Sequence, residues 1–319
     1  MIDEKKSLFL IGNGFDCYGH GMKTKYVDFR NYLVGKYPDN NYNYTGLLES
    51  RLMPDGGERY EQDELVGSII RTLDECEGEE WCDLERCLGD AFIDAIACEN
   101  EWAYEEMGDI SDDNNNIFRS VYENEELSKN ITGAYVLIEE LFRQWVFEKL
   151  SSIEYDYIPR MDKKPDFNKA LFLSFNYTAT LEKIYGVSEE DICHIHGYSL
   201  EPTSKILFGH GDDSEFTGYH QYWGIAEAYN RLKRSLRKDT QTALLNNMNF
   251  FNRIAGIKNV YSFGFSFSDV DMLYVEEICH QLNPNKVIWN FNKYDWKYNR
   301  ENVDKIRQMG FCVCECNTW

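Results

Sequence analysis

Residues 8–30 read LFLIGNGFDCYGHGMKTKYVDFR, and this stretch indicates the fold class. An apolar strand, Leu8–Ile11, runs directly into the turn Gly12-Asn13-Gly14, and the spacing of apolar residues predicts a helix from Thr24 to Gly35. A strand, a glycine turn and a helix are typical of nucleotide-phosphate sites, because glycines let the backbone approach a ligand and the helix start offers N–H groups. Asp16 fits poorly beside a phosphate, because its charge would repel one.

The bulk composition is that of a globular protein. The 319 residues are 43% hydrophobic and 15% aromatic, enough for a packed core. A formal charge of -22 makes an extended nucleic-acid-binding surface unexpected, because phosphate backbones are bound by basic faces. No apolar stretch approaches the roughly 18 residues of a membrane span, and no signal peptide is recognisable. We therefore expect a cytoplasmic protein without membrane contact.

The ten cysteines are scattered along the chain, which predicts reduced thiols rather than a disulfide framework. Cys312, Cys314 and Cys316 alternate and so share one face of a predicted strand. No CxxC pair and no ordered set of histidine partners accompanies them, and we interpret them as packing residues. No metal site and no structural zinc are therefore expected.

Strand and helix patterns alternate in the second half of the chain. Helical patterns lie at 179–185, 271–282 and 302–309, between short apolar segments. Such alternation predicts an α/β fold with a doubly wound, mostly parallel sheet. The strands predicted after Leu8–Ile11 are 170–176, 192–196, 205–210, 259–266, 286–292 and 311–316.

Between the first strand and the others the pattern is helical. From about Glu58 to Ser152, apolar residues recur at helical spacing, as in Leu65, Ile69 and Leu73. The acidic stretch 99–116 is expected to be a solvated loop. The predicted organisation is an α/β domain of residues 1–40 and 165–319 with a helical subdomain, 41–164, inserted into it.

The residues that follow the predicted strands are the candidates for chemistry, because ligands of such sheets bind beyond the carboxyl ends of strands. Asn176 ends one strand, and His196, followed by a glycine, ends another. A histidine at that place is able to exchange a proton near neutral pH. Gly264, Ser266 and Ser268 end a third strand, where small hydroxyls suit ribose or phosphate. Each also has a structural interpretation: Asn176 and Ser268 as helix caps and His196 as a hydrogen-bonded core residue.

Four segments together resemble the AbiH family of bacterial abortive-infection proteins. They are IGNGFDCYGHGMKTKYVDF, WCDLE (81–85), SFNYTATLEKIY with IHG, and GFSFSDVD. The resemblance runs from the first strand to about residue 272 and implies a role in phage defence.

A more distant resemblance is to sirtuins and to the sirtuin-like domains of antiphage NADases. The glycine turn, Asp28-Phe29-Arg30, the Asn176 strand end, His196-Gly197 and the late serine-bearing strand end occur in the same order. By this resemblance Asn176 fixes the ribose and a water, and His196 is the base. Asp16, which replaces the serine of the family turn, is placed with these two as a catalytic candidate. The residues implied to bind NAD are Gly12, Asn13, Gly14, Phe15, Phe29, Arg30, Gly264, Ser266 and Ser268.

Two departures narrow the implied activity. No proline precedes Asp28, and the zinc-ribbon cysteines that follow His-Gly in sirtuins are absent. Without that zinc module, the resemblance implies cleavage of NAD at its nicotinamide–ribose bond rather than protein deacetylation. NAD is then a substrate, and a phage-derived trigger is the expected partner, with a homo-oligomer left open.

Two other functions remain open from the sequence. The first is a non-catalytic sensor that binds an adenine nucleotide at the glycine turn. The second is a metal-dependent nuclease or hydrolase in which Asp16, Asp83, Glu85 and Asp271 collect a magnesium ion. For the WCDLE segment we favour a buried tryptophan beside an amphipathic helix over a catalytic Glu85.

Overall fold

The structure, a computed structural model, describes residues 5–38, 51–52, 58–101, 104, 117–155, 167–217 and 224–316. The chain divides into two compact units. The sheet unit comprises Met1–Lys25, Val146–Leu207 and Asp239–Trp319, and the helical unit comprises Tyr26–Trp145 and Phe208–Lys238. The predicted insertion comprised residues 41–164 only. The helical unit of the structure also contains the helix that begins at Tyr26 and the later segment Phe208–Lys238.

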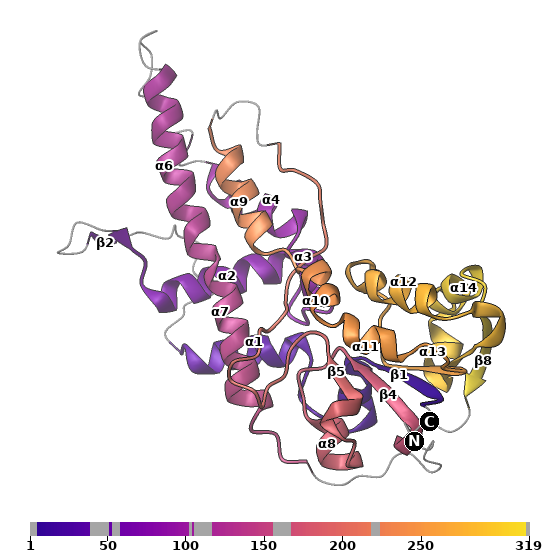
Figure 1. Ribbon diagram of the computed structural model, residues 1–319. Coiled ribbons are helices and arrows are strands. Elements are labelled where there is room, and N and C mark those ends of the chain that lie inside the picture. The colour runs from indigo at the N-terminus through magenta and orange to yellow at the C-terminus, as the bar shows by residue number, and fades with distance from the viewer. Residues whose placement is uncertain are drawn as a thin grey trace. The chain divides into compact units, whose positions relative to one another are not determined.

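The sheet unit contains one six-stranded sheet in which every pairing is parallel (Figure 1). Its strand order is β5-β4-β1-β6-β7-β8. The chain therefore begins in the middle, adds two strands on one side of β1, and then adds three on the other. This order reverses between β1 and β6, which is the switch point of a doubly wound sheet. The strands are β1 (Ser7–Ile11), β4 (Ala170–Ser174), β5 (Ile192–His194), β6 (Asn259–Phe263), β7 (Ile288–Asn292) and β8 (Cys312–Cys316).

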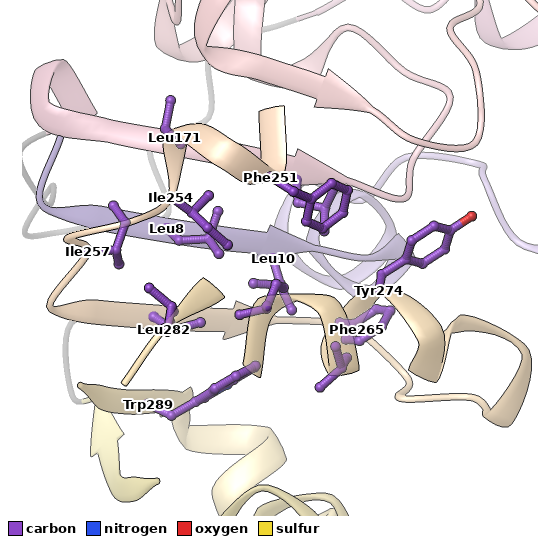
Figure 2. Close-up of a cluster of buried hydrophobic side chains, with 14 of the residues drawn as sticks. Leu8, Leu10, Leu171, Phe251, Ile254, Ile257, Phe265, Tyr274, Leu282 and Trp289 are labelled. Carbon is purple, nitrogen blue, oxygen red and sulfur yellow. The ribbon is translucent and has the colours of Figure 1, made fainter. Parts of the chain in front are cut away.

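The predicted fold class, α/β with a doubly wound parallel sheet, is confirmed by this topology. The central strands are continuous apolar runs because helices cover both of their faces. Leu8 and Leu10 pack into one hydrophobic cluster, drawn in Figure 2, and Phe9 and Ile11 pack into another on the opposite face. Alternate side chains of a strand point to opposite faces, so a single strand supplies both cores.

Helices of the sheet unit supply the rest of the larger cluster. Phe251, Tyr274 and Val303, each fully buried, come from three different helices and belong to the cluster that includes Leu10. The helices of this unit are α8 (Thr180–Tyr185), α10 (Thr240–Asn246), α11 (Met248–Arg253), α12 (Met272–Gln281), α13 (Lys293–Tyr298) and α14 (Arg300–Gln308).

In the helical unit, the predicted stripe Leu65, Ile69 and Leu73 lies on the buried face of α2. The sequence patterns did not identify α6 and α9. Of the acidic stretch 99–116, all but 99–101 and 104 lies outside the described residues. The unit contains α1 (Tyr26–Lys36), α2 (Gln62–Glu77), α3 (Leu84–Cys87), α4 (Asp90–Glu99), α6 (Ile117–Tyr135), α7 (Leu137–Trp145), α9 (Ala226–Ser235) and the short antiparallel strands β2 (Arg51–Leu52) and β3 (Glu58–Arg59).

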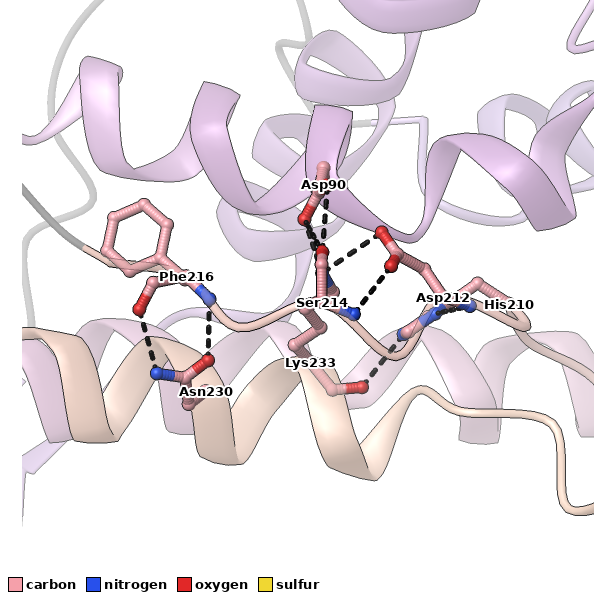
Figure 3. Close-up of polar contacts among 7 residues, drawn as sticks. All are labelled: Asp90, His210, Asp212, Ser214, Phe216, Asn230 and Lys233. Carbon is pink, nitrogen blue, oxygen red and sulfur yellow. Dashed lines mark hydrogen bonds and ion pairs between the residues drawn. The ribbon is translucent and has the colours of Figure 1, made fainter.

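A buried lysine of α9 holds the segment that precedes it in the helical unit (Figure 3). Lys233 Nζ forms ion pairs with Asp90 and Asp212 and donates a hydrogen bond to Ser214 Oγ. The Lys233 carbonyl accepts a hydrogen bond from His210 Nε2 at 2.9 Å. The loop from His210 to Ser214 is therefore fastened to α9 by polar side-chain contacts.

The predicted strand 205–210 is wrong. Within this segment only His210 forms a β-bridge, with Arg237. At Gly209 the backbone has φ +134, and an added Cβ would lie 2.1 Å from the carbonyl oxygen of Leu236. This conformation is one that glycine alone adopts readily, and it interrupts an extended strand.

Within the described ranges, no helix combines the length and the apolar character needed to cross a membrane. All ten cysteines are free thiols. The predicted strand that bears Cys312, Cys314 and Cys316 is confirmed as β8.

Candidate active site at the carboxyl edge of the sheet

The glycine turn after β1 packs directly against the end of β6. Gly12 donates its backbone N–H to the Phe263 carbonyl at 3.0 Å, and Gly14 donates to the Gly264 carbonyl at 3.1 Å. A Cβ on Gly12 would lie 2.3 Å from the Gly264 oxygen, and one on Gly264 would lie 2.4 Å from the Gly14 Cα. The three glycines therefore permit contact between two backbones. In this conformation the N–H groups of Gly12 and Gly14 are not available to a phosphate.

Asn13 and Phe15, the other predicted NAD-binding residues of the turn, also make contacts within the protein. The amide of Asn13 donates to the Thr24 carbonyl and accepts from the Thr24 hydroxyl, at 3.0 and 2.6 Å. The Phe15 ring is buried and packs edge-on against Phe263, with ring centroids 5.2 Å apart. These contacts fix the path of the chain through the π-helical turn Phe15–Gly19.

The carboxylate of Asp16 is fully buried and accepts hydrogen bonds from two threonines of the loop after β4. Thr178 Oγ1 lies 2.5 Å from Oδ2, and Thr180 Oγ1 lies 2.7 Å from Oδ1. Burial raises the pKa of Asp16 to about 6, and the bonds from Thr178 and Thr180 lower it in part. Asp16, whose charge argues against a phosphate at this turn, thus joins the turn after β1 to the loop after β4.

Asn176, at the end of β4, leaves one buried atom without a partner. Its Nδ2 donates to the Gly12 carbonyl at 3.1 Å, which fixes the orientation of the amide. Its Oδ1 accepts no hydrogen bond from any described residue, although Asn176 is only 6% exposed. A buried acceptor that is left unsatisfied costs about 1 to 3 kcal/mol, which a ligand or water at that oxygen would recover.

His196, just beyond β5, belongs to a chain of three polar side chains, of which His196 and Asp271 are buried. Its Nε2 lies 3.1 Å from Asp271 Oδ1, and Asp271 Oδ2 accepts a hydrogen bond from Ser268 Oγ at 3.1 Å. His196 and Asp271 are both 4% exposed. A carboxylate only accepts, so Nε2 carries a proton, and Nδ1 is the nitrogen on which a lone pair is able to act as a base. No hydrogen bond reaches Nδ1 from the described residues.

The segment that carries Ser268 is conformationally strained. Phe267 is a non-glycine residue with φ 55, and its ring is buried in the larger cluster. Such backbone strain is typical of segments that hold a functional side chain in place. Ser266 is exposed, and its carbonyl accepts a hydrogen bond from Asn302 at 3.1 Å. Of the two predicted serines, only Ser268 joins the polar chain of His196.

A second histidine at this edge was not predicted. His194, the last residue of β5, lies 2.7 Å from Glu182 Oε1 through Nε2 and 3.3 Å from the Asn176 carbonyl through Nδ1. Its ring stacks on Tyr198, with centroids 4.3 Å apart. The spacing His194-Ile195-His196, with Glu182 in the preceding helix, was the available sequence signal.

Phe29 and Arg30, predicted to cover the nicotinamide ribose, belong to the core of the helical unit. The Phe29 ring is fully buried among Trp81, Phe142 and Trp145. Arg30 donates two hydrogen bonds to Asp74, at 2.8 and 2.6 Å. Asp74 also accepts from the Trp81 indole, so the WCDLE tryptophan is buried as the structural interpretation predicts.

The four acids of the metal hypothesis have other partners. Asp83 pairs with Arg86, and Glu85 pairs with the buried Lys238 at 3.0 Å. Asp16 and Asp271 are held by the threonines and by His196 as described above. In the part of the chain that the structure describes, no three His, Cys, Asp or Glu side chains are grouped so as to hold a metal ion.

The fold and this edge define a doubly wound α/β protein with a buried histidine–aspartate pair beyond its parallel strands. The sequence pattern of the family described as "Bacteriophage abortive infection AbiH" matches residues 8–293. Because the match covers most of the chain, the protein belongs to the AbiH family and is a bacteriophage abortive-infection protein. No curated protein and no solved structure matches the chain.

Proposed function

We propose that this abortive-infection protein consumes NAD+ by hydrolysing the bond between nicotinamide and ribose. The observation that carries the proposal is the Ser268–Asp271–His196 chain at the carboxyl edge of the sheet, with its histidine–aspartate pair buried. This chain fixes the Nε2 side of His196 on Asp271 and leaves Nδ1 as the base. The order of the strands adds support, because dinucleotides bind at this edge of sheets with this order.

His196 acts as the general base in this reaction. The C1′–N bond breaks and its electron pair neutralises the pyridinium ring, so that nicotinamide leaves without protonation. Water then bonds to C1′ of an oxocarbenium-like ribose, and Nδ1 of His196 takes the proton that this water loses. Asp271 stabilises the imidazolium that forms, and Ser268 holds Asp271.

Asn176 positions the reacting groups. Its amide is fixed through Nδ2 on the Gly12 carbonyl, so Oδ1 offers an acceptor of constant direction. A ribose hydroxyl or the attacking water donates to that oxygen. Holding reactants in this way lowers the barrier because the orientational entropy is lost on binding rather than in the transition state.

The proposal assigns no ligand contact to several residues that the resemblance implied. The N–H groups of Gly12 and Gly14 are bonded to carbonyls of the protein, so the pyrophosphate is not placed on them. Phe29 and Arg30 are occupied in the helical unit. Asp16 acts on the loop after β4 rather than on the substrate.

The test is a substitution that removes the base and keeps the bond to Asp271. In His196→Gln the amide nitrogen takes the place of Nε2 and still donates to Asp271, whereas no atom replaces the basic Nδ1. Purified protein, alone and with lysate of phage-infected cells, is incubated with NAD+, and nicotinamide and ADP-ribose are quantified by mass spectrometry. We expect the turnover of the variant to fall about 100-fold or more at unchanged melting temperature.

The matched control is His280→Gln, because the side chain of His280 is 77% exposed. It should cleave NAD+ at the wild-type rate. Wild-type protein that confers defence yet leaves NAD+ intact under both conditions would refute the proposal. Tight NAD+ binding without turnover, together with full defence from His196→Gln, would instead support the non-catalytic sensor.

A further inference from the structure

Three buried oxygens near the ends of β4 and β5 make no hydrogen bond to any described residue. They are Asn176 Oδ1, Glu182 Oε2 and Ser199 Oγ. Asn176 and Ser199 are 6% and 2% exposed, and the side chain of Glu182 is 11% exposed. Buried polar atoms are almost always bonded, so an unsatisfied group of this kind indicates a site that a ligand or water completes.

The segments that bear these oxygens are joined by hydrogen bonds. The Asn176 carbonyl contacts His194 Nδ1, and His194 Nε2 contacts Glu182 Oε1. Ser199 donates its backbone N–H to the Tyr177 carbonyl at 2.8 Å. The loop after β4, helix α8 and the turn after β5 therefore form one connected polar region.

The contacts of His194 determine how Glu182 is held. A carbonyl only accepts, so Nδ1 of His194 must carry a proton. The bond of Nε2 to a carboxyl oxygen then places a further proton between His194 and Glu182. Oε1 of Glu182 is thereby fixed on the imidazole. The Tyr198 hydroxyl lies near the same carboxylate, and its pKa is raised by burial and by that negative charge. Oε2 itself has no donor of the described residues within hydrogen-bonding geometry.

We infer that Glu182 is a substrate-positioning residue whose Oε2 accepts a hydrogen bond from a ribose hydroxyl. The inference rests on the proposed cleavage of NAD+ and adds to it a sugar-binding residue. Fixed buried acceptors without protein partners suit a ligand that presents several O–H donors, as a ribose does. A carboxylate that accepts from ribose hydroxyls is the usual recognition group in doubly wound nucleotide-binding folds.

Glu182→Met is the decisive variant. Methionine keeps the length of the side chain and places no oxygen where Oε2 was an acceptor. Glutamine would not serve, because its NH2 would donate to Nε2 of His194 and its oxygen would then stand in place of Oε2. Titration calorimetry with ADP-ribose should show Kd raised at least 10-fold, and KM for NAD+ should rise similarly while kcat changes less than threefold. Glu190→Met, the same chemical change at an exposed residue, should leave both constants and the melting temperature unaltered.

Equal ADP-ribose affinity in wild type and Glu182→Met would overturn the inference even if the wild type cleaves NAD+. Loss of binding only in proportion to a fall in melting temperature would overturn it as well, since it would show a structural role alone. Wild type that binds ADP-ribose but does not cleave NAD+ would refute the proposed hydrolysis and leave the role of Glu182 standing. Wild type that binds neither would refute both.

Discussion

At the residue scale, Asp16 shows how burial and hydrogen bonding compete on one carboxylate. Burial raises its pKa from 3.8 to about 6, although the hydrogen bonds from Thr178 and Thr180 lower the pKa in part. A raised pKa means that the folded state binds the proton more tightly than the unfolded state does. The stability that protonated Asp16 contributes is therefore lost as the pH rises from about 4 through about 6. Above that range, the ionised carboxylate lowers the free energy of unfolding by about 3 kcal/mol relative to its protonated form.

Asp16→Asn should remove this pH dependence, because asparagine has no charge to bury. From pH 5 to pH 7.5 the wild type should lose about 1 kcal/mol of unfolding free energy relative to the variant. Urea unfolding of both proteins at the two pH values measures this difference. A constant difference between the two proteins would mean that the carboxylate does not titrate in that window.

Gly264 tests the contact between the turns after β1 and β6. Gly264→Ala adds a positive-φ penalty and places a Cβ 2.4 Å from the Gly14 Cα. Gly186, which follows α8, serves as the control. Its φ of +67 is close to the +61 of Gly264, but no heavy atom lies within 4 Å of the position that its Cβ would take. Gly186→Ala should therefore cost about 1 to 2 kcal/mol and Gly264→Ala about 3 to 5 kcal/mol. Equal losses in chemical denaturation would show that the backbone contact is unimportant.

At the element scale, the residues that begin and end an element were less predictable than the element itself. The apolar runs of β1 and β4 are recognisable because both faces of each strand are buried. β6 buries one face fully and the other in part, and β7 is at least partly buried except at its start. The segment 205–210 has a similar apolar composition, yet it forms no strand. Its path depends on the backbone of Leu236 and on His210, residues whose proximity the linear sequence does not show.

Lys233 tests how α9 holds that segment. Lys233→Met keeps the apolar stem and removes the charge, so Asp90 and Asp212 lose their common partner. Both acids are partly exposed, which limits the expected loss of unfolding free energy to about 1 to 3 kcal/mol. Arg234→Met, in the same helix, removes an exposed pair with Glu227 and should cost less than about 0.5 kcal/mol. Urea denaturation of the two variants measures the difference, and equal costs would contradict a holding role.

At the scale of the whole molecule, the sequence by itself determined the family and the fold class. The glycine turn, the FNYT and IHG segments and the alternation of strands with helices are local patterns, and local patterns are legible in a linear sequence. Asn176 and His196 could be selected because a parallel sheet gathers the residues that follow its strands at one edge.

Tertiary structure decided which partners those residues have. The bonds of Asp16 to Thr178, of His196 to Asp271 and of His194 to Glu182 join segments that lie on different strands and helices. It also placed Phe29 and Arg30 in the core of the helical unit. The physical reason is that hydrogen bonds and packing depend on distance in space. Sequence motifs fix the kinds of side chains, and the sheet order and loop paths determine which of them meet.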